Sequence, residues 1–84
     1  MDVFIYFPPN LGVDKDEIED ALDEVIGNLG EVSGGGIGEK GMNIDLDVED
    51  DADPEELVEL IRGVLARFKI ACTKIDINGK NLAP

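Results

Sequence analysis

Six carboxylates lie close together in the middle of the sequence: Asp45, Asp47, Glu49, Asp50, Asp51 and Asp53. An oxygen-rich cluster can bind calcium, but an EF-hand loop needs a glycine at its sixth position and a glutamate at its twelfth. Counted from Asp45, the twelfth position is Glu56, whereas the sixth is Asp50. The first acids also alternate with apolar residues, so they lie along a strand instead of surrounding an ion. The sequence therefore predicts no dedicated metal site and no cofactor, and leaves weak surface binding of cations as the alternative.

A glycine-rich stretch precedes these acids, and its residues 36–41 match the dinucleotide-binding pattern G-x-G-x-x-G. In nucleotide-binding proteins a helix follows the glycines, and its N-terminus meets the phosphates. Here the glycines lead into residues 42–49, which alternate with the period of a strand, and no Lys-Ser/Thr pair follows. We interpret the glycines as a hairpin loop at about residues 34–41, with contact to a partner as an additional role left open.

The sequence lacks the usual residues of acid–base and nucleophilic catalysis. It contains no histidine, which is the commonest general base and metal ligand. Cys72 and Ser33, the only cysteine and the only serine, therefore have no histidine to activate them. We expect Cys72 to pack within a strand, and we predict that the protein is not an enzyme.

Several features of the sequence bear on size and location. A chain of 84 residues is long enough for one domain and too short for two. The single cysteine cannot form an internal disulfide, which favours a reducing compartment. The first ten residues lack the basic segment of a signal peptide, and no apolar run reaches the roughly 20 residues that cross a bilayer. The expectation is a single-domain cytoplasmic protein.

Negative charge dominates the composition, with twenty acidic and seven basic residues and a formal net charge of −13. Nineteen of the acids lie in residues 1–61, whereas five of the bases lie in residues 62–84. Phosphate groups and anionic lipids attract positive charge, so nucleic acids and membrane surfaces are excluded as partners. A basic protein partner remains, and a salt-adapted surface is the alternative explanation.

The N-terminal half begins with a strand and a helix. Residues 3–7 form a β-branched and aromatic run that two prolines end. Asp14 is a suitable helix cap, and Glu17 stands at the capping-box position. Apolar residues then recur at helical spacing and Gly27 provides the end of the helix; the stripe consists of Ile18, Ala21, Leu22, Val25, Ile26 and Leu29.

The remaining elements are three strands and a second helix. Residues 31–33 form a brief strand before the glycines, and residues 42–49 form a strand with one apolar and one polar side. Asp53-Pro54 opens a helix that runs to about Phe68. A last strand at about residues 70–77 precedes the turn dipeptide Asn78-Gly79, and residues 80–84 are expected to form a loose tail.

This order predicts an α+β fold of the ferredoxin-like βαββαβ type. Such a fold is a four-stranded antiparallel sheet with both helices on one face, which leaves the other face open. The first strand has two orientations, and we prefer the one that buries Val3, Ile5 and Phe7 and leaves Tyr6 in water. The predicted partner-binding residues lie on the open face: Phe4, Tyr6, Asn43, Asp45, Asp47, Glu49 and Asp76, with Lys74 near them.

The small size, the acidity and the element order, together with SGGGIGEKGMNIDLD (residues 33–47), resemble bacterial immunity proteins of polymorphic and contact-dependent toxin systems. The resemblance implies tight binding to a toxin domain, often a basic nuclease, whose active site or an adjacent site is blocked. It carries over no catalytic or binding residue. The function expected is therefore an inhibitor or immunity protein that neutralises a basic toxin domain.

Two alternatives remain open at this point. The open face can be a homodimer interface of a small regulatory or ligand-binding domain, or it can be an ordinary solvated face. A minimal enzyme is the third hypothesis, and no group of residues in the sequence supports it.

Overall fold

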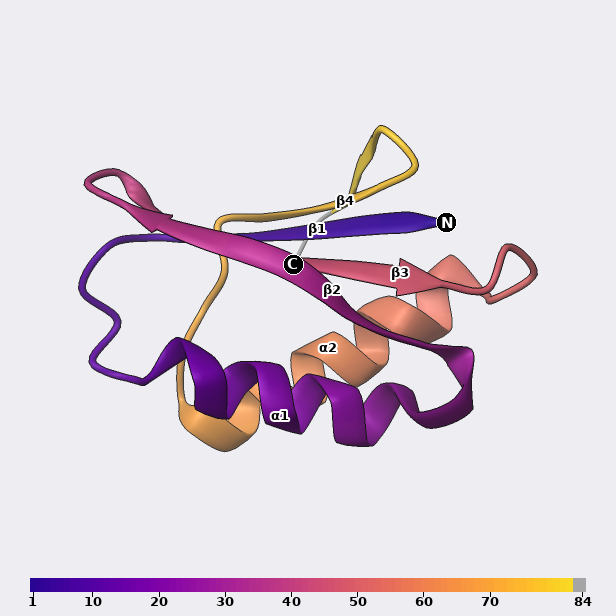
Figure 1. Cartoon of the computed structure of the whole chain (residues 1–84), viewed down its shortest axis with the longest axis horizontal. Coiled ribbons are helices and arrows are strands. Elements are labelled where there is room, and N and C mark those ends of the chain that lie inside the picture. The colour runs from indigo at the N-terminus through magenta and orange to yellow at the C-terminus, as the bar shows by residue number, and fades with distance from the viewer. Residues whose placement is uncertain (83–84) are drawn as a thin grey trace.

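The computed structural model describes residues 1–82 and shows an α+β fold, in which two helices cover one face of a five-stranded antiparallel sheet (Figure 1). A single turn of 3-10 helix, η1, follows the first α-helix. The elements are β1 (Asp2–Phe7), α1 (Lys15–Ile26), η1 (Gly27–Leu29), β2 (Gly30–Gly38), β3 (Gly41–Val48), α2 (Pro54–Phe68), β4 (Lys74–Ile77) and β5 (Lys80–Leu82).

The strands follow the order β2-β3-β1-β4-β5, with every neighbouring pair antiparallel. The first strand of the chain is therefore central. Phe4 lies opposite Asp45 of β3 on one side and opposite Asp76 of β4 on the other. Tyr6 lies between Asn43 and Lys74 in the same way.

The hydrophobic core lies between the sheet and the helices, and it confirms the predicted strand orientation. Val3, Ile5 and Phe7 are buried, whereas Phe4 and Tyr6 are partly exposed on the other face. Strand β3 buries its apolar side in the same layer, and both helices contribute their predicted stripes. The core side chains of β3 and the helices are Ile44, Leu46 and Val48, with Ile18, Ala21, Leu22, Ile26, Leu57, Val58, Ile61, Val64 and Leu65.

Both helices begin and end where the sequence predicts. The Asp14 carboxylate accepts a hydrogen bond from the backbone N–H of Asp16 at 3.2 Å, and Asp53 caps α2 in the same way through Glu55 at 3.0 Å. Pro54 occupies the first turn of α2, and Gly27 ends α1 with a positive φ of 57°. Short polar caps and a glycine are therefore sufficient to fix these boundaries.

The glycine-rich segment is placed differently from the prediction. Residues 34–38 are not a loop, because they continue the edge strand β2 as far as Gly38, and the turn to β3 contains only Glu39 and Lys40. A β-bulge at Ser33 shifts the pairing between Val32 and Gly34. Glycine has a low strand propensity, so the pairing with the strongly patterned β3 overrides the local preference.

The C-terminal end also differs from the prediction. The sheet has five strands instead of four, because residues 80–82 of the expected loose tail pair with β4 as β5. The predicted Asn78-Gly79 turn is confirmed, and both residues have positive φ. Strand β4 begins only at Lys74, so Cys72 lies in the connection after α2 and not in a strand. Residues 83–84 of the tail lie outside the described residues.

A candidate protein-binding face

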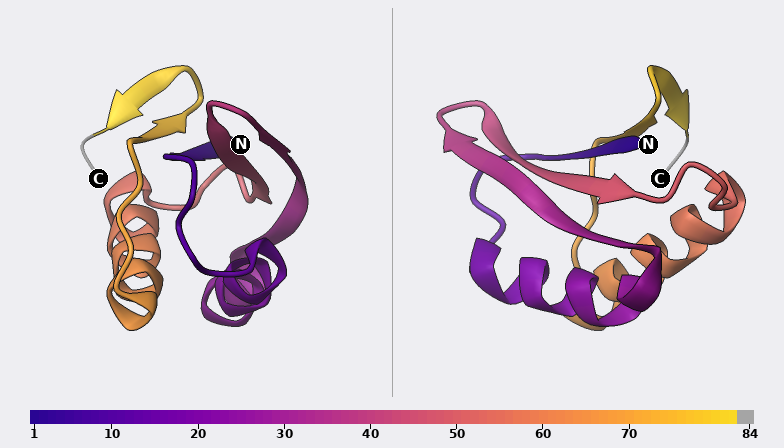
Figure 2. Two further views of the ribbon diagram at one scale, coloured as in Figure 1. Left: turned by 90° about the vertical axis from the view of Figure 1, so that its left-hand side faces the viewer. Right: turned by 45° about the vertical axis from the view of Figure 1, so that its right-hand side comes forward.

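The side of the sheet that faces away from the helices is called the open face here (Figure 2). Alternation along each strand places a polar or aromatic residue there opposite each buried one. The face carries five carboxylates and one amine among residues 1–82. Its residues are Asp2, Phe4, Tyr6, Glu31, Gly34, Gly36, Asn43, Asp45, Asp47, Lys74, Asp76 and Asn81.

Six of the seven predicted binding residues lie together on this face. Phe4, Tyr6, Asn43, Asp45, Asp47 and Asp76 occupy neighbouring positions on β1, β3 and β4. Glu49 does not join them, because β3 ends at Val48. The backbone N–H of Glu49 instead donates to the Leu29 carbonyl at 2.7 Å, which turns the chain away from the sheet.

One row across the open face consists of three acids on adjacent strands. Asp47 lies directly opposite Glu31 of β2 and Asp2 of β1. Like charges at opposed positions destabilise a sheet, so this row stores electrostatic repulsion in the folded protein. A positively charged group placed over the row would relieve that repulsion.

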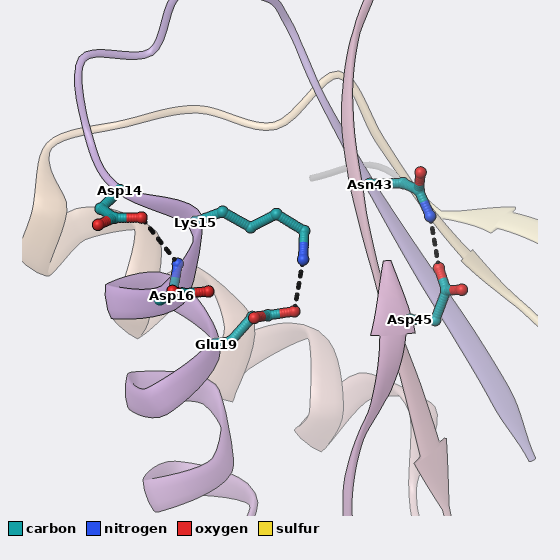
Figure 3. Close-up of polar contacts among 6 residues, drawn as sticks. All are labelled: Asp14, Lys15, Asp16, Glu19, Asn43 and Asp45. Carbon is teal, nitrogen blue, oxygen red and sulfur yellow. Dashed lines mark hydrogen bonds and ion pairs between the residues drawn. The ribbon is translucent and has the colours of Figure 1, made fainter. Parts of the chain in front are cut away.

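A second row places an aromatic ring between two carboxylates. Phe4 is flanked by Asp45 and Asp76, and the Asp76 Oδ1 atom is buried without a hydrogen-bond partner among residues 1–82. Asp45 Oδ1 accepts a hydrogen bond from the Asn43 side-chain amide at 2.7 Å, on the side of the strands away from α1 (Figure 3). The second row therefore combines a hydrophobic contact surface with carboxylate oxygens that can accept donors from outside.

A third row crosses the sheet near the β2–β3 turn. The Lys74 Nζ atom lies 4.7 Å from the centre of the Tyr6 ring, a cation–π contact that fixes the tyrosine beside Asn43. A shallow groove of about 700 Å³ opens at this end of the sheet. Tyr6, Asn43, Lys74 and the turn residues line it, together with Ile37, which is the only exposed large hydrophobic residue among those described (76% exposed).

The described residues offer no constellation for metal or nucleophilic chemistry. Within residues 1–82, no group of three or more Cys, Asp or Glu side chains is placed to hold a metal ion. Cys72 is buried, as predicted for a packing role, and burial raises the pKa of its thiol. A higher thiol pKa lowers the thiolate fraction at neutral pH, which is opposite to what a nucleophile requires.

Sequence reasoning missed several members of the open face. Asp2 and Glu31 join it only because the strand register brings them opposite Asp47, and Gly34 and Gly36 join it only because β2 extends through the glycines. A period-two pattern from Glu31 would have been the available signal, but the bulge at Ser33 interrupts it.

No family model matches the chain, and comparison with curated proteins and with solved structures finds no match. Neither helix within residues 1–82 has the length and the apolar character needed to cross a membrane.

Proposed function

We propose that the protein is a non-enzymatic binding module, an inhibitor or immunity protein that neutralises a basic toxin domain through its open face. The observation that carries the proposal is the arrangement of Phe4 between Asp45 and Asp76, with the acidic row of Asp47 beside it. An aromatic anchor among carboxylates is suited to a partner that presents cationic side chains around an apolar centre.

The fold belongs to the same proposal. We infer a ferredoxin-like arrangement extended by one strand, because β2-β3-β1-β4 is the order that two split βαβ units produce. The added β5 lies at the edge beyond β4 and leaves the open face uncovered. A reducing, cytoplasmic location is proposed from the single cysteine.

Electrostatics supports a basic partner over a second copy of the chain. The formal net charge is −13, so two copies repel each other at long range, whereas a basic protein is steered toward the carboxylates. Complementary charge raises association rates, and close charge pairs in tight complexes can contribute several kcal/mol. The acidic rows therefore act on both the encounter and the bound state.

Charge-neutral variants test this proposal in a pull-down from the native host. The tagged double variant Asp45→Asn/Asp47→Asn removes two open-face charges, and Asp16→Asn/Asp20→Asn removes two exposed charges of α1 as the matched control. The wild type and the α1 control should recover one stoichiometric basic protein, and the open-face variant should lose most of it. Equal recovery by all three variants would refute binding through the open face.

Self-association is the second candidate, and the uncovered aromatic positions Phe4 and Tyr6 are the observation that favours it. Light scattering separates it from the first, because self-association makes the apparent mass rise with protein concentration. Recovery of the bait alone, together with such a rise, would support the regulatory dimer instead.

A further inference from the structure

The outer edge of β2 is a row of backbone groups that the fold leaves unpaired. Strand β2 ends the sheet on one side, and it is nine residues long, whereas the opposite edge strand β5 has three. Long edge strands are templates for pairing with another chain, and proteins usually block them with lysine, proline or a covering segment. None of these protections occurs within Gly30–Gly38 (Figure 1).

The hydrogen bonds of β3 show which groups of β2 point outward. The Val48 N–H donates to the Met1 carbonyl at 2.9 Å, so Val48 and every second residue before it bond toward β1. The alternate residues of β3 bond toward β2, among them Asn43 and Asp45, which pair with Gly36 and Gly34. The intervening residues Gly35 and Ile37 therefore direct their N–H and C=O groups away from the sheet.

The fold blocks only the first part of this edge. The outward N–H of Val32 donates to the Asp23 carboxylate of α1 at 2.8 Å, which occupies the edge before the bulge. Among residues 1–82, no hydrogen bond other than the β2–β3 pairing involves residues 34–38. The free edge is thus a defined segment of five residues that ends at the exposed Ile37.

The side chains next to the free edge favour a cationic neighbour. Gly34 and Gly36 leave the open face bare at the edge, and the polar side chains of β3 lie toward them. Asp45 Oδ2 lies 3.8 Å from where a Gly34 Cβ would stand, and Asn43 Oδ1 lies 3.5 Å from the equivalent point at Gly36. Strands lie about 4.8 Å apart, so a lysine on an added strand can extend across a bare glycine and reach the Asp45 carboxylate.

We propose that an extended basic segment of the protein partner adds to the sheet as a sixth strand along residues 34–38. This inference rests on the proposed function, because it describes how the same partner reaches beyond the open face. Backbone bonds to Gly35 and Ile37 supply the pairing, and lysine or arginine side chains over Gly34 and Gly36 reach Asp45 and Asn43. A second copy is a poor occupant, because pairing of two β2 strands brings Asp23, Glu31 and Asp45 of one copy toward those of the other.

The test uses a synthetic peptide as the probe, acetyl-Thr-Lys-Val-Lys-Thr-Lys-Val-amide, added to the isotope-labelled protein in a nuclear magnetic resonance titration. Saturable shifts and slower hydrogen exchange at the amides of Gly35 and Ile37 are expected. The same peptide with every backbone nitrogen methylated keeps its charge but has no N–H donors, so it should produce neither effect. A peptide with serine in place of lysine should bind more weakly.

A pair of variants at one position isolates the backbone contribution. Ile37→Pro removes an outward N–H at an exposed edge position that proline tolerates, whereas Ile37→Thr keeps the N–H and removes the same apolar side chain. The proline variant should bind the peptide about tenfold more weakly than the threonine variant, the effect of one lost hydrogen bond. Thermal melting confirms that both variants remain folded, and equal affinities would overturn the inference.

Other outcomes separate this inference from the proposed function. Shifts at Phe4 and Asp45 without protection of Gly35 and Ile37 would overturn strand addition and leave binding by the open face standing. Protection that grows with protein concentration in the absence of peptide would identify a second copy as the occupant and overturn the basic segment. Equal binding of the lysine and serine peptides, or no saturable shift up to millimolar peptide, would overturn the inference as well.

Discussion

Gly34 and Gly35 are adjacent in the sequence, yet they lie on opposite sides of β2 and have different surroundings. A Cβ at Gly35 would lie 2.5 Å from the backbone oxygen of Asn43, whereas a Cβ at Gly34 would meet only Asp45 Oδ2 at 3.8 Å. The close approach of β2 to β3 therefore requires glycine at position 35. Position 34 carries no such requirement from the fold, which is why we assign its bare surface to binding.

A pair of alanine substitutions tests this difference between neighbours. Gly35→Ala should lower the free energy of unfolding by about 1–3 kcal/mol, because the added methyl group forces the strands apart. Gly34→Ala should change it by no more than about 0.5 kcal/mol. Urea denaturation measures both values, and equal losses of stability would show that the packing around β2 is described incorrectly.

Cys72 offers a second prediction at the scale of a single residue. Burial raises the pKa of its thiol, so at pH 8 the folded protein holds less reactive thiolate than an exposed cysteine does. Labelling by a thiol reagent should be slow in the native protein and fast in urea, and the native rate should rise with pH above the usual range for cysteine. A native rate equal to the rate in urea would contradict the buried position.

At the scale of elements, the sequence predicts what local pattern determines and misses what pairing determines. The helices and β1 and β3 follow from capping residues and from alternation, which are local, so their positions and buried faces are confirmed. Strand β2 and strand β5 form only because stronger neighbours pair with them. For the same reason Phe4 and Asp45 were assigned to one face correctly, whereas the register that adds Asp2 and Glu31 was not predictable.

The β4–β5 hairpin gives a prediction with a built-in control. Gly79 has a φ of 82°, where alanine costs about 1–2 kcal/mol, so Gly79→Ala should destabilise the protein and increase exchange at residues 80–82. Gly63 lies within α2 with no atom near its Cβ position. The same change there, Gly63→Ala, should stabilise the protein by about 0.5–1 kcal/mol. Denaturation of both variants checks the opposite signs, and a loss of stability in Gly63→Ala would contradict an open helical site.

At the scale of the whole molecule, the charge is distributed unevenly across the sheet. Helix α1 and the strands β2 and β3 carry a large share of the acids, whereas Arg67 and Lys69 at the end of α2 and Lys74 and Lys80 on β4 and β5 provide basic groups at the other side. The acidic side is also the side with the unpaired edge. The proposed partner therefore meets its electrostatic attraction and its backbone pairing at the same place.

Salt should act on folding and on binding in opposite directions. Between about 10 mM and about 1 M salt the Debye length falls from about 30 Å to about 3 Å, which screens the self-repulsion of the negative charges. The Tm should therefore rise by several degrees, since about 1 kcal/mol corresponds to about 4–8 °C in a domain of this size. Binding of a basic partner should weaken over the same range. A Tm that falls with added sodium chloride would show that attractive charge pairs dominate instead.

Photo-crosslinking in the native host tests the central claim most directly. The photoreactive residue p-benzoylphenylalanine replaces Phe4 on the open face or, as the control, Phe68, a partly exposed phenylalanine on the helical side. We predict that position 4 crosslinks to one basic protein and that position 68 does not. Crosslinks from position 4 only to a second copy of the chain, or to the basic protein only from position 68, would contradict the account.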